Sequence, residues 1–136
     1  MKHRIFIADD HRIVRDGLRA LIEKETDLVL AGMADDGRQA LKMVRKLEPD
    51  VVIMDIAMPG RDGQQTLDDI RKVEELHGVS GLEACTVIMI TALDDSENIM
   101  RAFHQGKCEA YLTKPLDREK LFSLLRELGL VGEQKI

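Results

Sequence analysis

The sequence contains no tryptophan, one tyrosine and only two cysteines among its 136 residues. Cys85 and Cys108 form neither a C-x-x-C redox pair nor a zinc-binding spacing, so we expect two buried free thiols. No apolar stretch approaches the roughly 20 residues of a transmembrane helix. The first apolar run ends at Asp9–Asp10, too early for a signal peptide. These absences exclude a disulfide scaffold and favour a soluble cytoplasmic protein without a membrane partner.

The chain also has fewer basic than acidic residues. The chain has 20 basic and 25 acidic residues, a net charge of −5, which argues against a domain that coats nucleic acid or anionic lipid. Hydrophobic residues make up 44% and charged residues 33%, as in a globular chain of one domain. We therefore expect one domain over residues 1–130, a short tail over 131–136, and no direct contact with nucleic acid.

Short apolar runs alternate with longer segments in which apolar residues recur every three or four positions. The runs predict strands, and they are Ile5–Ala8, Leu28–Met33, Val51–Met54, Val87–Ile90 and Ala110–Leu112. The longer segments predict helices, with candidate N-caps at Asp36, Asp62 and Asp117. Strict alternation of this kind predicts an α/β fold, a doubly wound parallel sheet of five strands with five helices.

The pattern also predicts details of the third and fourth helices and of one long connection. The third helix is predicted from the spacing of Leu67, Ile70, Val73 and Leu76. The fourth, beginning near Asp94, is predicted to bury Ile99, Met100 and Phe103. Gly78 and Gly81 interrupt the pattern between His77 and Cys85, which indicates an unusually long connection between the third helix and the fourth strand.

Polar residues stand at the carboxyl ends of the predicted strands, where open parallel sheets bind their ligands. The first strand ends in Asp9–Asp10, the third in Asp55, the fourth in Thr91 and the fifth in Thr113-Lys114-Pro115. Carboxylates brought close together repel one another, and a hard cation such as Mg²⁺ relieves the repulsion through oxygen ligands. Any one of the aspartates could be a helix cap, but together with Lys114 they predict a site for a divalent cation and a phosphate.

Four segments together resemble the motif set of the response-regulator receiver domain of two-component signalling. They are Ala8-Asp9-Asp10-His11, Met54-Asp55-Ile56-Ala57-Met58-Pro59-Gly60, Thr91-Ala92 and Leu112-Thr113-Lys114-Pro115. The resemblance covers nearly the whole chain, and the second half is similar to stand-alone receivers of the chemotaxis-regulator type. It implies the flavodoxin-like strand order 2-1-3-4-5, and a phosphoacceptor that catalyses its own phosphorylation and dephosphorylation rather than a conventional enzyme.

The resemblance assigns the metal and the phosphoryl group to particular residues. Asp55 would take a phosphoryl group from the phosphohistidine of a sensor histidine kinase or a phosphotransfer protein. Asp10, Asp55 and the backbone carbonyl of Ala57 would bind Mg²⁺, for which Mn²⁺ is a possible substitute. Asp9 would assist directly or through a water molecule.

The resemblance also implies a conformational switch. Lys114 would pair with one phosphoryl oxygen and the Thr91 hydroxyl would bond another. Thr91 and Tyr111 would then rearrange the surface of the fourth helix, fifth strand and fifth helix for an unidentified protein partner, in a monomer or a phosphorylation-dependent dimer. The bond before Pro115 would be cis.

Simpler interpretations of single residues stand beside these roles. Without the resemblance, Tyr111 is a half-buried packing residue and Lys114 a solvated loop lysine. His11 is interpreted as a solvated residue of the first helical turn rather than as a metal ligand. Ala57 and Leu93 offer no polar side chain to orient an attacking water, so we expect slow self-dephosphorylation.

Other functions compete with the signalling receiver. The opening D-D-H-x-x-V-R resembles receivers that carry a helix-turn-helix output, so the chain could be the receiver fragment of a DNA-binding transcriptional regulator. Only about twenty residues follow Lys114, so we expect no output domain within this chain. An aspartate-nucleophile phosphatase would need an acidic residue where Ala57 stands. A flavodoxin would need a phosphate-cradling loop and stacking aromatics. A constitutive docking module remains open.

Overall fold

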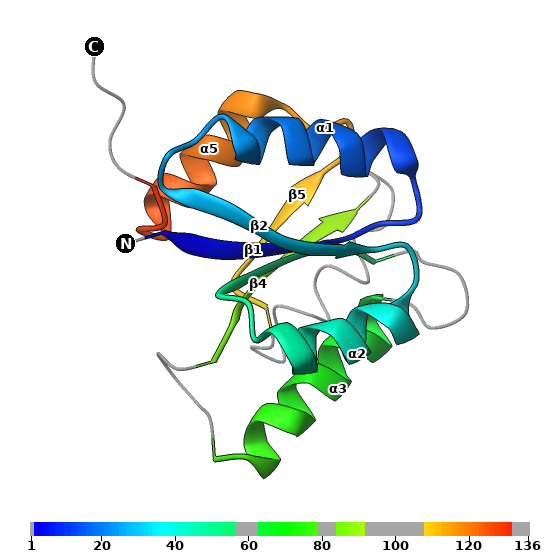
Figure 1. Cartoon of the computed structure of the whole chain (residues 1–136). Helices are drawn as coiled ribbons and strands as arrows, with labels where there is room; N and C mark the ends of the chain where they lie inside the picture. The colour runs from blue at the N-terminus through cyan, green and yellow to red at the C-terminus, as the bar shows by residue number, and fades with distance from the viewer. Residues whose placement is uncertain (1, 57–62, 79–83, 92–107, 132–136) are drawn as a thin grey trace.

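The computed structural model describes residues 2–56, 63–78, 84–91 and 108–131, and its strands form one parallel sheet (Figure 1). The strands are β1 (His3–Ala8), β2 (Leu28–Ala34), β3 (Val51–Asp55), β4 (Thr86–Thr91) and β5 (Ala110–Thr113). Their order is β2-β1-β3-β4-β5, and every neighbouring pair is parallel. The predicted doubly wound sheet and its strand order are confirmed.

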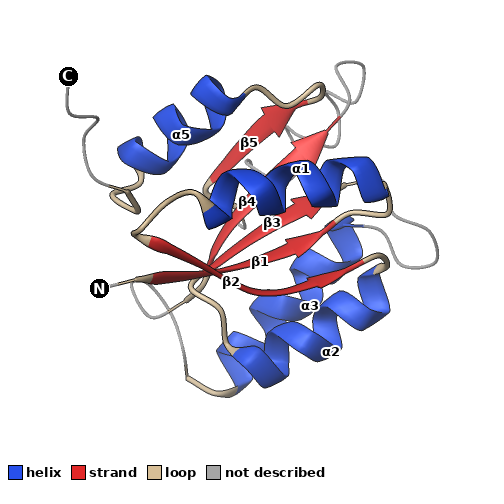
Figure 2. Ribbon diagram, turned by 45° about the horizontal axis from the view of Figure 1, so that its top comes forward, coloured by secondary structure: helices blue, strands red, loops and turns tan. Residues whose placement is uncertain are grey.

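Helices cover both faces of the sheet. Among the described residues they are α1 (Arg12–Glu23), α2 (Gly37–Leu47), α3 (Gly63–Leu76) and α5 (Arg118–Glu127). Helices α1 and α5 lie on one face, and α2 and α3 on the other (Figures 1 and 2). The helix predicted near Asp94 and the cap predicted at Asp62 lie outside the described residues.

Helix boundaries follow local chemistry. Asp36 accepts a hydrogen bond from the backbone N–H of Gln39 at 2.8 Å, and Asp117 accepts one from Glu119 at 2.8 Å, so both side chains satisfy free N–H groups of a first turn. Helix α2 ends at Leu47, and its C-cap residue Glu48 has a left-handed backbone with φ of 48°. Pro49 follows it and disfavours continuation of the helix.

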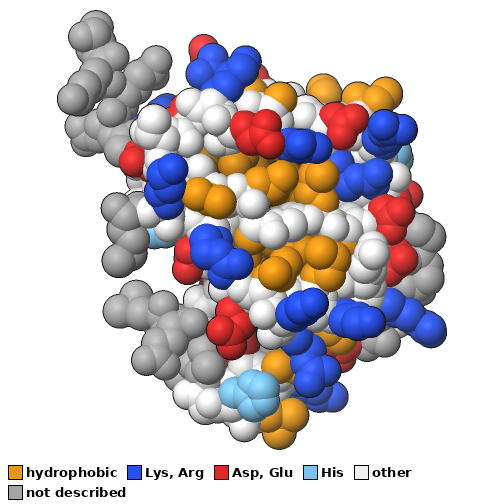
Figure 3. Space-filling view, in the orientation of Figure 1, with side chains coloured by type: hydrophobic (Ala, Val, Ile, Leu, Met, Phe, Trp, Pro, Cys, Tyr) orange, Lys and Arg blue, Asp and Glu red, His pale blue; other side chains and the backbone are white. Residues whose placement is uncertain are grey.

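The core forms one apolar layer on each face of the sheet. Strand β1 alternates between them: Ile5 and Ile7 pack with residues of α1 and α5, whereas Phe6 and Ala8 pack with residues of α2 and α3. Strand β3 is buried along its whole length, as its unbroken apolar run predicts for a central strand. Strand β2 is an edge, and apolar side chains flank it between α1 and α2 (Figure 3).

Helix α3 buries only some of its apolar positions. Leu67 and Ile70 are buried, whereas Leu76, the last residue of the helix, is 83% exposed. Leu76 lies nine residues after Leu67, and with about 3.6 residues per turn that spacing places it on the opposite side of the helix. Its exposure therefore follows from the helical period itself, because apolar residues at every third position drift around the helix.

Polar contacts anchor the end of the long connection that precedes β4. The Arg71 guanidinium donates to Glu74 Oε1 at 2.7 Å, to the carbonyl of Cys85 at 2.8 Å and to Glu109 Oε1 at 3.1 Å. Glu74 accepts from the backbone N–H of Cys85 at 2.7 Å, and Glu109 accepts from that of Val87 at 2.6 Å. Both cysteines are free thiols, and no helix in the described ranges is long and apolar enough to cross a membrane.

Candidate functional site

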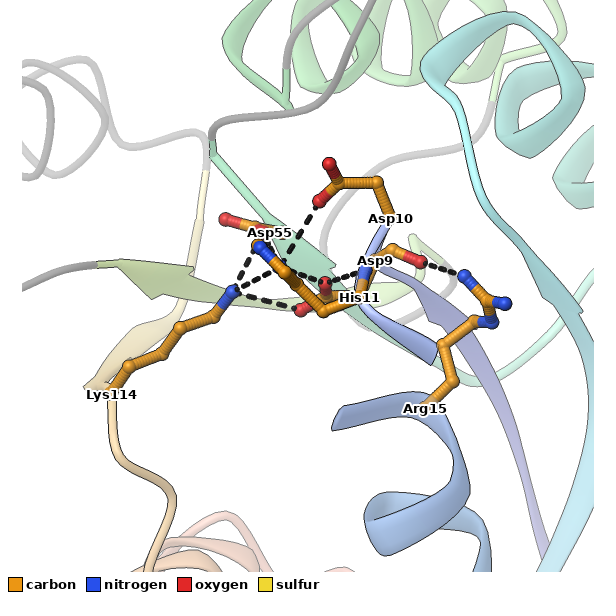
Figure 4. Close-up of polar contacts among 6 residues, drawn as sticks. All are labelled: Asp9, Asp10, His11, Arg15, Asp55 and Lys114. Atoms are coloured by element: carbon orange, nitrogen blue, oxygen red, sulfur yellow. Dashed lines mark hydrogen bonds and ion pairs between the residues drawn. The ribbon is translucent and has the colours of Figure 1, made fainter. Parts of the chain in front are cut away.

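The carboxyl ends of β1 and β3 bring three aspartates together. The two strands are neighbours in register, Ala8 beside Met54, so Asp9 and Asp10 emerge next to Asp55. The side chain of Asp9 is fully buried and that of Asp55 is 4% exposed. Carboxylate oxygens of all three lie within 4.8 Å of one another and of His11 Nδ1 (Figure 4).

Lys114 reaches this cluster from the end of β5. Its Nζ donates to Asp55 Oδ2 at 2.9 Å and lies 3.3 Å from Asp9 Oδ2. Burial works to lower the pKa of Lys114, but the hydrogen bond to Asp55 and the charges of Asp55 and Asp9 outweigh it and raise this pKa above its ordinary value. The ammonium therefore stays charged and partly neutralises the carboxylates.

His11 is exposed, as its sequence context predicts, but one of its ring nitrogens lies beside the cluster. Its side chain is 59% exposed, in keeping with a solvated first-turn residue. Its Nδ1 lies 3.0 Å from Asp9 Oδ1, 3.2 Å from Asp10 Oδ1 and 3.1 Å from Lys114 Nζ. No periodic pattern reports the direction of a side chain at a helix boundary.

Backbone contacts fix the start of α1 against the end of β1. The backbone N–H of His11 donates to Asp9 Oδ1 at 2.8 Å, and the Arg15 guanidinium donates to the carbonyl of Asp9 at 2.6 Å (Figure 4). These bonds hold Asp9 and His11 in their places beside the cluster.

The remaining predicted site residues line the same edge of the sheet. Thr91 ends β4 and is buried, and its carbonyl accepts from the Lys114 backbone N–H at 2.8 Å. Tyr111 lies on β5 and is 44% exposed. The Lys114–Pro115 peptide bond is cis. Ala57 and Leu93 lie outside the described residues.

Gly63 supports the end of β3, and sequence reasoning missed it. Its N–H donates to the carbonyl of Ile56 at 2.8 Å. A Cβ on Gly63 would overlap the backbone oxygen of Asp55 and approach Ile56 Cα to 2.8 Å. Only glycine lets α3 begin this close to the strand that carries Asp55. The position was visible in the sequence as a glycine at a helix start, but nothing there reports the approach.

The residues fit a divalent cation. Asp9 Oδ2 is buried and makes no hydrogen bond among the described residues, although Lys114 Nζ lies nearby. Within the described part of the chain, three carboxylates face one ammonium, so these residues together carry excess negative charge. Their ligand atoms are mainly the oxygens that Mg²⁺ prefers.

Comparisons with known proteins identify one family over most of the chain. Residues 5–126 match the family model of the response regulator receiver domain. The chain is 29% identical over 123 residues to the nitrate/nitrite response regulator protein NarL of Escherichia coli K12, covering 90% of this chain and 53% of NarL. It is 33% identical over 133 residues to the uncharacterized transcriptional regulatory protein YhcZ of Bacillus subtilis, covering 98% of this chain and 57% of YhcZ.

Solved structures share the fold. The receiver domain of AraT, a response regulator from Geobacillus stearothermophilus, superposes with a TM-score of 0.79 at 29% identity, covering 94% of this chain and 93% of that one. The chain spans about half the length of the curated relatives it matches.

Proposed function

The chain belongs to the response regulator receiver domain family, and we propose that Asp55 is its phosphoacceptor. Receiver domains of this family accept a phosphoryl group from a histidine kinase or another phosphodonor, and they are not conventional enzymes. The observation that carries the assignment is the contact of 2.9 Å between Asp55 Oδ2 and Lys114 Nζ, inside a cluster with unbalanced negative charge. Among the clustered carboxylates only Asp55 stands at the end of the central strand.

The reaction forms a bond between phosphorus and an Asp55 oxygen while the bond from phosphorus to the donor's histidine nitrogen breaks. Asp55 needs only to be ionised and in line, since phosphoryl transfer depends on positioning and on neutralising the charge of the equatorial oxygens. Lys114 supplies one positive charge at 2.9 Å from the attacking carboxylate. Mg²⁺ held by Asp10 and Asp55, with Asp9 assisting, would neutralise the rest.

The response to phosphorylation is assigned to Thr91 and Tyr111. Thr91 is buried at the end of β4, one residue after Ile90, which pairs with Asp55 of β3, and its backbone oxygen accepts from the Lys114 backbone N–H. A phosphoryl group on Asp55 would therefore lie near both residues. Tyr111 is half exposed on the neighbouring strand β5. A shift of Thr91 toward the phosphoryl group would change the packing near β5 and α5 and present a new surface to a protein partner.

The test is phosphorylation by acetyl phosphate. The chain is incubated with acetyl phosphate and Mg²⁺ and weighed intact, beside Asp55→Asn and the control Asp16→Asn, whose side chain is 60% exposed on α1. The parent and Asp16→Asn should each gain one phosphoryl group, and Asp55→Asn should gain none. A gain that persists in Asp55→Asn rejects Asp55 as the acceptor.

A second candidate concerns the whole protein. The curated relatives include transcriptional regulators about twice the length of this chain, so the chain could be the receiver of a DNA-binding regulator. Such a receiver would pass its signal on by dimerisation. Light scattering before and after phosphorylation distinguishes the receiver of a DNA-binding regulator from a receiver that signals to another protein. A dimer that forms only on phosphorylation favours the DNA-binding regulator, and a monomer in both states favours signalling to another protein.

A further inference from the structure

Strand β2 is an edge of the sheet that lacks the usual protection against pairing. Beyond its ladder to β1, the described residues give its backbone one further bond, from the N–H of Asp9 to the carbonyl of Ala34. Its sequence, Leu-Val-Leu-Ala-Gly-Met-Ala, contains no charged residue and no proline, the residues that commonly keep an edge strand from pairing with another chain. The outer backbone groups of β2 are therefore available to a further strand.

The two faces beside this edge differ in chemistry. On the α1 face, Leu30 and Met33 of β2 are partly exposed and present apolar surface. On the other face, α2 covers β2 closely: a Cβ on Gly32 would approach Leu47 Cδ1 to 3.0 Å and Met43 Cε to 3.3 Å. A strand added beside β2 would therefore meet apolar side chains on one face and the surface of α2 on the other.

The surface of α2 is basic. The helix contains no acidic residue and four basic ones, Arg38, Lys42, Arg45 and Lys46. All four are exposed, and within the described part of the chain none of them forms an ion pair or a side-chain hydrogen bond. In contrast, the exposed Arg19 of α1 pairs with Glu23 at 2.9 Å. In a chain with a net charge of −5, the exposed side of α2 is a local region of positive potential that attracts an acidic partner.

Two of these basic residues lie on the side of α2 that borders β2. Successive residues are about 100° apart around a helix, and Lys42 and Lys46 directly precede Met43 and Leu47. On the helical wheel Met43 and Leu47 separate the two lysines from the buried Val44, so the lysines follow the side chains that cover β2. Figure 3 shows Lys and Arg side chains gathered over α2, beneath the apolar side chains that flank β2.

We propose that β2 and the bordering side of α2 form a docking surface for an acidic, extended segment of another protein, which adds to the sheet as a strand beside β2. Side chains of an extended strand alternate between two faces. A segment that alternates acidic and apolar residues would place its carboxylates beside Lys42 and Lys46, and its apolar side chains beside Leu30 and Met33. Main-chain hydrogen bonds to the edge supply affinity, and the alternating side chains select the sequence.

A second copy of this chain fits the docking surface less well than a peptide segment. Antiparallel pairing of two β2 strands requires a twofold axis normal to the sheet, which brings both α2 helices to the same face, with Lys42 and Lys46 opposite like charges. The register between β1 and β2 also shifts after Ile5, which pairs with Leu30, and this leaves Ala31 unpaired in that ladder. A bulge of this kind increases the twist of the edge, and a single segment follows a twisted edge more readily than a second sheet does.

The probe is the peptide Glu-Val-Glu-Val-Glu-Val-Glu, as long as β2, added to the isotope-labelled chain without phosphodonor. Amide NMR shifts should change along β2 and α2, and fluorescence anisotropy of a labelled peptide gives the dissociation constant. Lys42→Glu and Lys46→Glu should each weaken binding by about fivefold or more, because the charge reversal removes an exposed ion pair and adds a repulsion. The control Lys120→Glu, exposed on α5, should bind as the parent does. Circular dichroism checks that each variant is folded.

Two further peptides test the strand pairing itself. One carries N-methyl groups on its Val amides and the other on its Glu amides. Successive N–H groups of an extended strand point to opposite edges, so each peptide loses the donors of one edge only. One of the two should bind and the other should not, because only one edge of the segment can face β2. Equal binding of both would show that charge alone holds the peptide, which overturns the strand addition.

The remaining outcomes also decide the proposal. No binding of the unmethylated peptide at millimolar concentration overturns it, as does binding that neither lysine substitution weakens. Binding of the chain to vesicles of phosphatidylcholine and phosphatidylserine, but not to the peptide, overturns it and assigns the basic side of α2 to a lipid surface. Dimerisation through β2 overturns it in favour of a second copy. Asp55→Asn should bind the peptide as the parent does, since the docking surface does not depend on the phosphoacceptor.

Discussion

Adding one methyl group at Gly63 should destabilise the protein and displace Asp55. The new Cβ would overlap the backbone oxygen of Asp55 and lie 2.8 Å from Ile56 Cα. Both atoms belong to the backbone of a strand and its continuation, so neither can rotate away as the end of a flexible side chain could. Overpacking of this kind costs typically 1–3 kcal/mol, and rigid neighbours place Gly63→Ala at about 3 kcal/mol.

The same substitution at Gly17 is the matched control. Gly17 lies inside α1, and a Cβ there meets nothing within 4 Å. Alanine is a better helix former than glycine, so Gly17→Ala should stabilise the protein by about 0.5–1 kcal/mol. The two variants differ from the parent by the same atoms and should shift its stability in opposite directions.

Urea unfolding followed by circular dichroism measures the difference. With an m-value of about 2 kcal/mol/M, the midpoints of the two variants should lie roughly 2 M apart. Phosphorylation by acetyl phosphate should also slow in Gly63→Ala, because the overlap displaces the residue that carries the acceptor carboxylate. A Gly63→Ala protein as stable as the parent would show that α3 can move away from β3 without cost, which refutes the reasoning.

Two further predictions concern the contacts before β4. Arg71→Met should lower the free energy of unfolding by about 2 kcal/mol, because it leaves Glu74 and the carbonyl of Cys85 without their partly buried donor. The exposed control Arg19→Met should leave the midpoint of the same urea titration nearly unchanged, because exposed ion pairs contribute little to stability. Burial raises the pKa of the Cys85 thiol from 9.0 to about 12, with the charge of Glu74 adding to it, so iodoacetamide at pH 8 should label Cys85 far more slowly in the native protein than in urea. Because the folded state holds the thiol proton more tightly than the unfolded state, this proton's contribution to the free energy of unfolding is present below pH 9.0 and is lost as the pH rises toward about 12. Equal labelling rates in the native protein and in urea, or a free energy of unfolding that stays constant over that pH range, would contradict the burial of Cys85.

The sequence predicted the features that depend on the regular period of a strand or a helix. The unbroken apolar run Val51–Met54 predicts a strand covered on both faces, and β3 is buried throughout. Asp36 followed by Gln39 predicts a helix cap, and the bond is present at 2.8 Å. The strand ends could be placed together because parallel strands share one edge, and that rule alone brings Asp9 and Asp55 together. The strand order came from the family resemblance.

Two features could not be predicted, each because it depends on distance across the fold. The requirement for glycine at Gly63 depends on how closely α3 approaches β3. The direction of His11 Nδ1 depends on a bend between strand and helix, where neither the helical nor the strand period applies. Both residues lie at the starts of helices.

The charges of the cluster connect the metal to the phosphoryl group. Lys114 Nζ and His11 Nδ1 lie among the carboxylates, 3.1 Å apart. A divalent ion at the proposed site would compete with the ammonium for Asp55, so Lys114 should weaken metal binding before phosphorylation. A phosphoryl group on Asp55 would add negative charge and acceptor oxygens and so give the ammonium and the metal separate partners. Metal affinity should therefore rise with phosphorylation and, because such coupling is reciprocal, bound metal should favour the phosphorylated state.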